Sequence, residues 1–318
     1  MRPNNFSPAS TVVYLNLNNV WYCYDSSRPP LGRGALGIVY LGFRCDNQDR
    51  VAIKKINGQY VNNMTIRNLV RYEASMVFNH PNVVRMIGLC EQPNGYGDMY
   101  LICEYVSGIT FSDRARQLSV LPSAERIRQV VCDVRAILPA LKHMHALGYI
   151  HRDLKPSNMM VDSASNVKLM DLGVAASISA LRNGVSSEFV GTPQYSSPEQ
   201  VQCLECDERS DIYSMGVVLY ELATGENPFN GESQEEIFHK QLYSALPENS
   251  ALPTKLYNII KKATEKEASN RYPSVDALET ALLNYLYNNS NESSGSSGVI
   301  AFVIVLVVMI LVLMLALS

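Results

Sequence analysis

The pattern of apolar residues changes once along the chain, and this change limits the folds that the chain can adopt. In the first part, short runs rich in β-branched and aromatic residues are bounded by Gly, Asn and Asp, as in 37–42, 50–55 and 99–105. Such runs are typical of strands. In the second part, apolar residues recur at intervals of three and four from Ile127 to Leu141, which indicates an amphipathic helix. Strands followed by helices predict an α+β fold with two lobes.

A second helix is expected over 211–222, where the residues are apolar almost all round. A helix without a polar face is normally buried, so we expect this one in the core of the second part. Pro139 lies in the later half of the first helix and is expected to kink it, because proline removes a backbone hydrogen bond.

The composition fits a globular protein. The chain has 318 residues, of which 47% are apolar and 18% are charged, and this excludes wholesale disorder. The formal net charge of −3 argues against a dedicated nucleic-acid-binding protein, which would usually be strongly basic. Seven scattered cysteines in a chain of this length favour a reducing compartment over a disulfide framework.

Three chemically useful side chains lie close together in the run 151–158, which reads HRDLKPSN. Asp153 can accept a hydroxyl proton, and Lys155 can neutralise a phosphoryl group during its transfer. The side-chain carbonyl of Asn158 can hold a metal ion. A polar surface loop is the less favoured interpretation, and we expect a catalytic loop here.

Other motifs could bind phosphate or metal. Gly32, Gly34 and Gly37 form the pattern G-x-G-x-x-G, in which backbone N–H groups can approach a phosphate chain. A strand follows it, which disfavours the dinucleotide-binding version of the pattern. Lys54 ends an apolar strand and could meet phosphate oxygens. Asp171 ends another and is a natural Mg²⁺ ligand. A plain glycine turn and a solvated lysine are the alternatives for the first two motifs.

Taken in order, these motifs resemble those of eukaryotic-type (Hanks-type) protein kinases over about residues 28–280. The segment 191–199, GTPQYSSPE, and the letters KPSN resemble the Ser/Thr branch, and 209–216 and 270–274 resemble bacterial members. The resemblance implies a two-lobed kinase fold, with a small strand-rich N-lobe and a larger helical C-lobe. It also implies transfer of the γ-phosphate of ATP, bound with Mg²⁺ or Mn²⁺, to Ser or Thr of protein substrates.

The resemblance assigns residues to the nucleotide. The segment from Leu31 to Val39 would cover ATP, and Lys54 would bind its α- and β-phosphates. Residues 104–106 would be the hinge that hydrogen-bonds adenine, with Cys103 as the gatekeeper. The residues expected at the nucleotide are Leu31, Gly32, Arg33, Gly34, Gly37, Val39, Ala52, Lys54, Cys103, Glu104 and Val106.

The same resemblance assigns the catalytic groups. Asp153 would be the catalytic base, Lys155 would contact the γ-phosphate, and Thr192 would position substrate and base. Asn158 and Asp171 would hold the metal ion.

Structural and regulatory roles are also implied. Glu199 would pair with Arg271 and brace the C-lobe, and Asp211 would hold the backbone of the catalytic loop. Arg152 is a ready partner for a phosphate on the segment between the metal motif and Glu199, so activation by phosphorylation is expected there. The best candidate sites are Ser186 and Ser187.

The partner of Lys54 has two candidates. The sequence EAS at 73–75 favours Glu73, with a shortened helix end. An ungapped alignment would place Arg71 there instead, because two helical residues rotate a side chain by about 200°.

The C-terminal end carries an uncharged run. Residues 299–317 read VIAFVIVLVVMILVLMLAL, which as a helix would span roughly 28 Å, close to a bilayer core. We expect a transmembrane helix, with a buried or aggregation-prone tail as the alternative. The Ser/Asn/Gly-rich residues 288–298 predict a flexible linker, and residues 1–24 predict an N-terminal extension without a secretory signal.

The chain is therefore expected to be a tail-anchored, single-pass membrane protein. Its kinase domain, 25–287, would lie in the cytoplasm, with an N-lobe at 25–106 and a C-lobe at 107–287. It would phosphorylate Ser or Thr of protein substrates and self-associate for autophosphorylation, without nucleic acid. The alternative is a membrane-anchored pseudokinase scaffold, which would not need the complete set Lys54, Asp153, Asn158 and Asp171.

Overall fold

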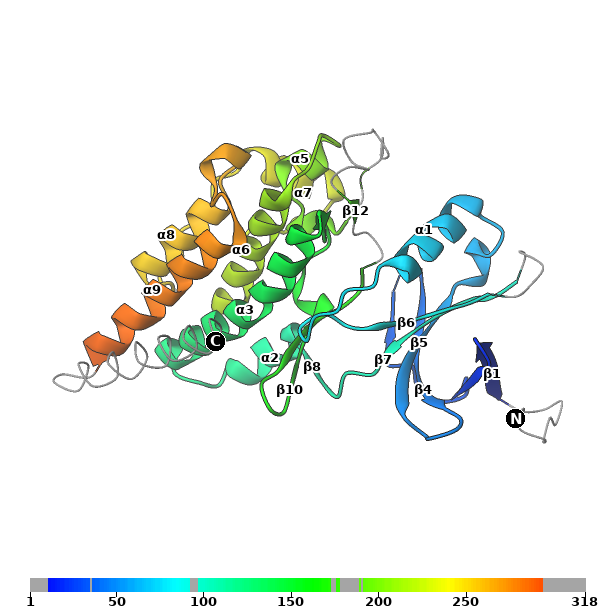
Figure 1. Ribbon diagram of the computed structural model, residues 1–318. Helices are drawn as coiled ribbons and strands as arrows, with labels where there is room; N and C mark the ends of the chain where they lie inside the picture. Colours follow the sequence, from blue (N-terminus) through cyan, green and yellow to red (C-terminus); the bar gives the residue numbers. More distant parts are fainter. Residues whose placement is uncertain are drawn as a thin grey trace, which may run out of the picture.

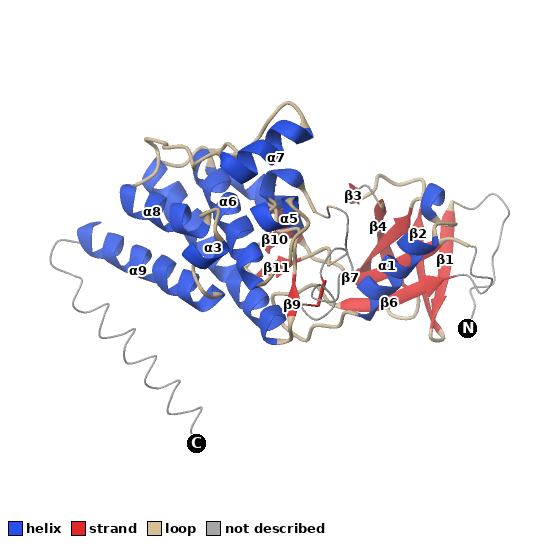
Figure 2. Cartoon of the chain, turned by 90° about the horizontal axis from the view of Figure 1, so that it is seen from above, coloured by secondary structure: helices blue, strands red, loops and turns tan. Residues whose placement is uncertain are grey.

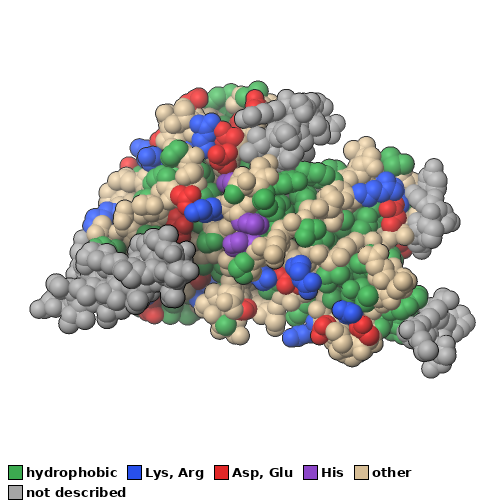
Figure 3. Space-filling view, in the orientation of Figure 1, with side chains coloured by type: hydrophobic (Ala, Val, Ile, Leu, Met, Phe, Trp, Pro, Cys, Tyr) green, Lys and Arg blue, Asp and Glu red, His purple; other side chains and the backbone are tan. Residues whose placement is uncertain are grey.

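The computed structural model describes residues 11–34, 36–91, 97–172, 176–177, 189 and 191–293. Two lobes lie side by side, a sheet with one helix and a larger assembly of helices (Figure 1). The predicted two-lobed α+β fold is confirmed. Lys/Arg and Asp/Glu side chains are interspersed over the face seen in Figure 3.

The smaller lobe is built on an antiparallel sheet in the order β1-β2-β4-β5-β7-β6, with β3 paired to β4. Helix α1 (Met64–Ser75) lies along this sheet (Figure 2). The strands are β1 (Val12–Leu17), β2 (Val20–Asp25), β3 (Gly32–Arg33), β4 (Gly37–Arg44), β5 (Arg50–Ile56), β6 (Met86–Glu91) and β7 (Met99–Glu104).

The two-residue period of the strands sorts their side chains between two cores. Val51 and Ile53 of β5 face a cluster with β1 and β2, whereas Ile56 faces α1 together with Leu101 of β7. Successive side chains of a strand point to opposite faces. Lys54 therefore points to the face that carries α1.

The structure places β1 and most of β2 within the predicted N-terminal extension, residues 1–24. β1 and β2 form a hairpin in the sheet, and Leu15 is buried. The far side of β1 also approaches β6, where the Cys90 thiol donates to the Asn16 carbonyl. Val13, Leu15 and Leu17 alternate with polar or aromatic residues, so a half-buried strand could have been inferred. The sheet therefore begins before the predicted domain boundary at residue 25.

The larger lobe is helical, with two short sheets facing the smaller lobe. Its helices are α2 (Phe111–Leu118), α3 (Ser123–Ala146), α5 (Pro198–Val201), α6 (Glu208–Thr224), α7 (Gln234–Tyr243), α8 (Thr254–Ala263) and α9 (Val275–Ser293). Its strands are β8 (Gly108–Thr110), β9 (Tyr149–Ile150), β10 (Met159–Asp162), β11 (Val167–Leu169) and β12 (Ala176–Ser177).

Helix α6 is the centre of this lobe and carries the buried helix predicted over 211–222. Nearly every residue of α6 is buried, and it contacts α3, α8 and α9. Asp207 caps its N-terminus, where its side chain accepts from the Arg209 N–H, and Gly225, whose φ of 88° favours glycine, caps its C-terminus. Helix α3 continues through Pro139 for a further turn and more.

The end of the described chain differs from the predicted linker. Helix α9 runs to Ser293, so residues 288–293 are helical rather than part of a flexible 288–298 segment. One side of its earlier part, including Leu282 and Tyr285, is buried, and each residue added to an existing helix gains a backbone hydrogen bond. Among the described residues, no helix combines the length and apolar character needed to cross a membrane. The predicted span, 299–317, lies outside them.

Candidate active site

Lys54 lies at the junction of the two lobes between two carboxylates. Its Nζ is 3.4 Å from Glu73 Oε1 on α1 and 3.0 Å from Asp171 Oδ1, which follows β11. The Glu73 side chain is buried, that of Lys54 is 16% exposed, and that of Asp171 is 46% exposed. One cation therefore links the sheet, the helix and the second lobe.

This arrangement favours the charged form of the lysine. Burial alone would lower the pKa of Lys54, but the charges of Asp171 and Glu73 outweigh it and hold the pKa above its usual value. In turn, the Lys54 ammonium lowers the pKa of Asp171. Both groups are thus ionised at neutral pH.

The structure decides between the two candidate partners of Lys54. Glu73 is 4% exposed and faces the lysine. Arg71 lies on another side of α1, where it pairs with Glu91 of β6. Helix α1 ends at Ser75, which is the shortened end that Glu73 requires.

The predicted nucleotide residues line the same face. Ala52 of β5 is opposite Cys103 of β7, and Val39 of β4 is opposite Lys54. Burial raises the pKa of the Cys103 thiol to about 12, which favours the protonated thiol at neutral pH. The Glu104 carboxylate accepts from Lys168 Nζ at 2.5 Å and from the Arg85 N–H at 3.0 Å. Because the carboxylate is engaged in this way, the backbone of Glu104 is the part of this residue that a ligand can meet.

The glycine pattern divides into two roles. A Cβ on Gly32 would meet nothing within 4 Å, and one on Gly34 would meet only the Gly37 oxygen at 3.9 Å. These two glycines leave open space. In contrast, a Cβ on Gly37 would be 2.3 Å from the Lys55 carbonyl, so strand packing requires glycine there. Leu31 and Arg33 flank the turn and are exposed.

The catalytic loop holds Asp153 among donors. Thr192 Oγ1 donates to Asp153 Oδ1 at 2.5 Å, and Lys155 Nζ is 2.8 Å from Oδ2. Asn158 Nδ2 donates to the Asp153 carbonyl and to Oδ2, at 2.9 and 3.1 Å. The carboxylate is therefore oriented from several sides, and the Asn158 Oδ1 is the atom left for a metal ion.

The catalytic loop is fixed to the core of its lobe through Asp211. This fully buried carboxylate accepts from the backbone N–H groups of His151 and Arg152, both at 2.9 Å. His145 Nε2 lies 2.8 Å from the same carboxylate. Burial opposes the charge, but these bonds and the nearby histidines lower the pKa of Asp211. Arg152 and Asp171 have φ values of 69° and 55°, a conformation uncommon outside glycine.

Arg271 and Glu199 form the predicted pair. Two guanidinium nitrogens of Arg271 donate to the two Glu199 oxygens at 2.7 and 2.8 Å, and the Arg271 side chain is fully buried. The same guanidinium also donates to three backbone carbonyls. The pair joins α5 to the segment before α9.

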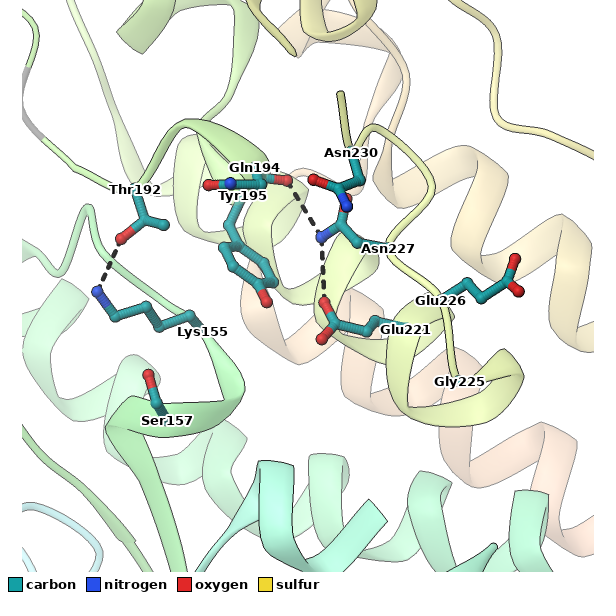
Figure 4. Close-up of a pocket in the computed structure, with 10 residues that line it drawn as sticks. All are labelled: Lys155, Ser157, Thr192, Gln194, Tyr195, Glu221, Gly225, Glu226, Asn227 and Asn230. Atoms are coloured by element: carbon teal, nitrogen blue, oxygen red, sulfur yellow. Dashed lines mark hydrogen bonds between the residues drawn. The ribbon is translucent and has the colours of Figure 1, made fainter. Parts of the chain in front are cut away.

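A cavity of about 720 Å³ opens beside the catalytic loop (Figure 4). Its walls come from the catalytic loop, from the platform 192–195 and from the end of α6 with the following turn. It is lined by Lys155, Ser157, Thr192, Gln194, Tyr195, Glu221, Gly225, Glu226, Asn227 and Asn230. At the edge of the cavity, Lys155 donates a hydrogen bond to Thr192, and both residues contact the Asp153 carboxylate.

The structure leaves some predicted residues undescribed and adds others. Ser186 and Ser187 lie outside the described residues. No sequence motif marked His145 beneath the catalytic loop or Lys168, which ties β11 to Glu104. Lys168 precedes Asp171 by three residues, and His145 lies on the helix that leads into the catalytic loop. Only this proximity could have suggested them.

The sequence also matches known protein kinases. The family model for the protein kinase domain matches residues 26–283. The chain is 34% identical to "Probable serine/threonine-protein kinase PknB" of Lactococcus lactis and 33% identical to "Serine/threonine-protein kinase PrkC" of Bacillus subtilis, covering 79% and 78% of this chain. This chain is also 32% identical to "Serine/threonine-protein kinase PknB" of Mycobacterium tuberculosis, and the match covers 80% of this chain.

The chain spans 40%, 38% and 41% of these three relatives, so the likeness concerns one part of each. Within that part lie Lys54 with its acidic partners and the catalytic loop with Asp153. The chain belongs to the protein kinase family.

Proposed function

We propose that this protein is a serine/threonine protein kinase that transfers the γ-phosphate of ATP to proteins. One observation carries the proposal: Asp153 is held by Thr192, Lys155 and Asn158 at the edge of a cavity large enough for a side chain of a polypeptide. The names of the relatives in Lactococcus, Bacillus and Mycobacterium support the Ser/Thr assignment.

The donor set fits a nucleotide and a divalent cation. Lys54 is a charged ammonium at the junction of the two lobes, and the turn at Gly32 and Gly34 leaves open space. Asn158 and Asp171 supply oxygen ligands of the type that Mg²⁺ or Mn²⁺ prefers. ATP with its metal ion supplies the phosphoryl group when bound. Lys54 would hold the α- and β-phosphates, and Asn158 and Asp171 would hold the metal ion.

The residues of the chain then perform positioning and proton transfer. Asp153 accepts the hydroxyl proton of the acceptor, while Lys155 neutralises charge on the phosphoryl oxygens. Thr192 orients both, because its hydroxyl lies 2.5 Å from Asp153 Oδ1 and 2.7 Å from Lys155 Nζ. The proximity of these groups favours an active enzyme over the scaffold alternative.

The test is incubation of the purified protein with radiolabelled ATP, Mg²⁺ and a generic basic protein. Labelled phosphoserine or phosphothreonine is expected after acid hydrolysis. Complete lack of transfer, together with normal ATP binding, would favour the pseudokinase scaffold.

We further propose that the run 299–317 tethers the kinase domain to a membrane, with the domain on the cytoplasmic side. The support is the uncharged run itself, which has no polar face. The expected result is that full-length protein resists carbonate extraction while its kinase domain is digested in vesicles that expose the cytoplasmic face. A version ending at Gly298 should be released from the membrane fraction. Carbonate release of the full chain would contradict the tether.

Phosphorylation between Asp171 and Glu199 is proposed to activate the enzyme. Arg152 is 8% exposed, and its Nε has no hydrogen-bond partner among the described residues. Burial lowers the pKa of this guanidinium, so a phosphate nearby would compensate its charge. Phosphopeptide mapping of fully active enzyme should find phosphate at Ser186 or Ser187, and active enzyme unmodified at both would exclude them.

A further inference from the structure

The platform beside Asp153 is held by its backbone. Three successive carbonyls, of Pro193, Gln194 and Tyr195, accept hydrogen bonds from side chains of the C-lobe. Ser214 of α6 donates to Tyr195 O at 2.7 Å, and Asn227, after α6, donates to Gln194 O at 3.4 Å (Figure 4). Gln241 Nε2 donates to Pro193 O at 3.0 Å. The last contact comes from a different helix, α7.

Gln241 is itself part of a buried chain of hydrogen bonds. It is fully buried, and its Oε1 accepts from the Tyr213 hydroxyl at 2.6 Å. That hydroxyl accepts from Lys266 Nζ at 3.0 Å, and the Lys266 ammonium lies 4.0 Å from the centre of the Phe229 ring. The orientation of Gln241 is thus set by the Tyr213 hydroxyl, which is itself held by Lys266.

A change at the Pro193 carbonyl would reach the catalytic carboxylate through the neighbouring residue, Thr192. Pro193 directly follows Thr192, whose hydroxyl contacts Asp153. Without Gln241, the part-buried Pro193 carbonyl would keep only the longer bond from the Ser196 N–H at 3.3 Å, so the platform would be held less firmly. A less firmly held platform would displace Thr192, and a shift of about 1 Å in a positioning group can lower a rate by roughly 10²-fold.

We propose that Gln241 is a positioning residue for phosphate transfer: through the Pro193 carbonyl it fixes Thr192 beside Asp153, and Tyr213 and Lys266 hold Gln241 in the required orientation. This inference rests on the proposed kinase function. It assigns to α7 a part in acceptor binding, in addition to the contact between the Phe189 and Phe238 rings, whose centres are 4.9 Å apart.

The test compares four forms of the full chain: wild type, Gln241→Leu, Tyr213→Phe and the control Gln234→Leu. Gln234 is exposed at the first position of the same helix, so the control makes the same chemical change away from the platform. Tyr213→Phe keeps the ring and removes only the hydroxyl. kcat and KM are measured for a generic basic protein and for ATP, and hydrogen exchange is measured over 192–196.

Gln241→Leu is expected to lower kcat/KM for the acceptor about tenfold or more, with KM for ATP within about twofold of wild type. Tyr213→Phe should act in the same direction by a smaller factor. The amides of Tyr195 and Ser196, which donate to Thr192 O and Pro193 O, should exchange faster in both variants. The control should match wild type in every measurement.

Several results would overturn the proposal. These are unchanged exchange at Tyr195 and Ser196 in both variants, faster exchange with acceptor kinetics within twofold of wild type, or equal losses for ATP and acceptor. If Gln241→Leu does not fold, Tyr213→Phe decides alone by the same criteria. If wild type transfers no phosphate, the proposed function fails, and the exchange measurement still decides whether the hydrogen-bond chain holds the platform.

Discussion

The two halves of the site are built differently. On the nucleotide side, Lys54 and Glu73 belong to the small lobe and Asp171 to the large lobe, and they are joined by ion pairs. On the acceptor side, Asp153 and Thr192 both belong to the large lobe and are joined by short hydrogen bonds supported by buried side chains.

The difference has a physical consequence. Ion pairs act over distance and tolerate small displacements, so the nucleotide side can persist while the lobes shift. Hydrogen bonds weaken steeply with poor geometry, so the acceptor side depends on a rigid lobe. The nucleotide side therefore tolerates small changes in the position of the lobes, whereas the acceptor side depends on packing around α6.

The largest effect is expected from Asp153→Asn, which changes only the acceptor side. Loss of the base should lower kcat by about 10²- to 10⁴-fold. The asparagine can still accept from Thr192, so the fold and ATP affinity should be preserved. Single-turnover experiments measure the rate, and titration with a fluorescent nucleotide measures the ATP affinity. A variant that kept more than a tenth of the wild-type rate would remove Asp153 from the role of base.

Lys54→Met should break the nucleotide side and leave the acceptor side intact. We expect a loss of activity of about 10²- to 10³-fold, because an ammonium aimed at the phosphates is removed. Hydrogen exchange over 192–196 should equal that of wild type. Faster exchange there would show that the two halves are coupled, contrary to the comparison above.

Glu73→Gln and Arg71→Gln form a matched pair on one helix. Glu73→Gln removes a charge that faces Lys54 and should lower kcat about tenfold, which corresponds to a rise of ~1.4 kcal/mol in the activation free energy. Arg71→Gln removes a surface pair with Glu91 and should leave kcat within about twofold. The reverse ranking would favour the ungapped alignment.

The smallest effect concerns Lys266, which supports the acceptor side. Burial, and then the charge of Arg271, lower the pKa of Lys266 to about 7, from a usual 10.5. Between these values the unfolded chain binds more protons, so stability should rise with pH from about 7 towards 10. Urea unfolding at pH 7 and 9 should show a gain of about 1 kcal/mol in wild type, after allowance for solvent screening. Lys266→Met should lack this gain.

Local chemistry and spacing in the sequence were sufficient for much of the site. The motif 151–158 brings Asp153, Lys155 and Asn158 together within one loop, so their proximity needs little more than the chain itself. The two-residue period of β5 places Lys54 on the face of the sheet that carries α1, and places Val51 and Ile53 on the other face. The aperiodic apolar run over 211–222 indicated the buried helix at the centre of the C-lobe.

Other features depend on where distant segments meet. The hairpin of β1 and β2 joins the sheet through pairing with β4, and the choice of Glu73 over Arg71 depends on where α1 ends against the sheet. Gln241 lies 48 residues from Pro193 on a helix with an ordinary amphipathic pattern, and no local signal marks it. The sequence alone determined which chemical groups the chain brings to a reaction, because those groups lie within short motifs. Only the tertiary structure decided what holds them in place, because a buried hydrogen bond depends on two segments packing within about 3 Å of each other.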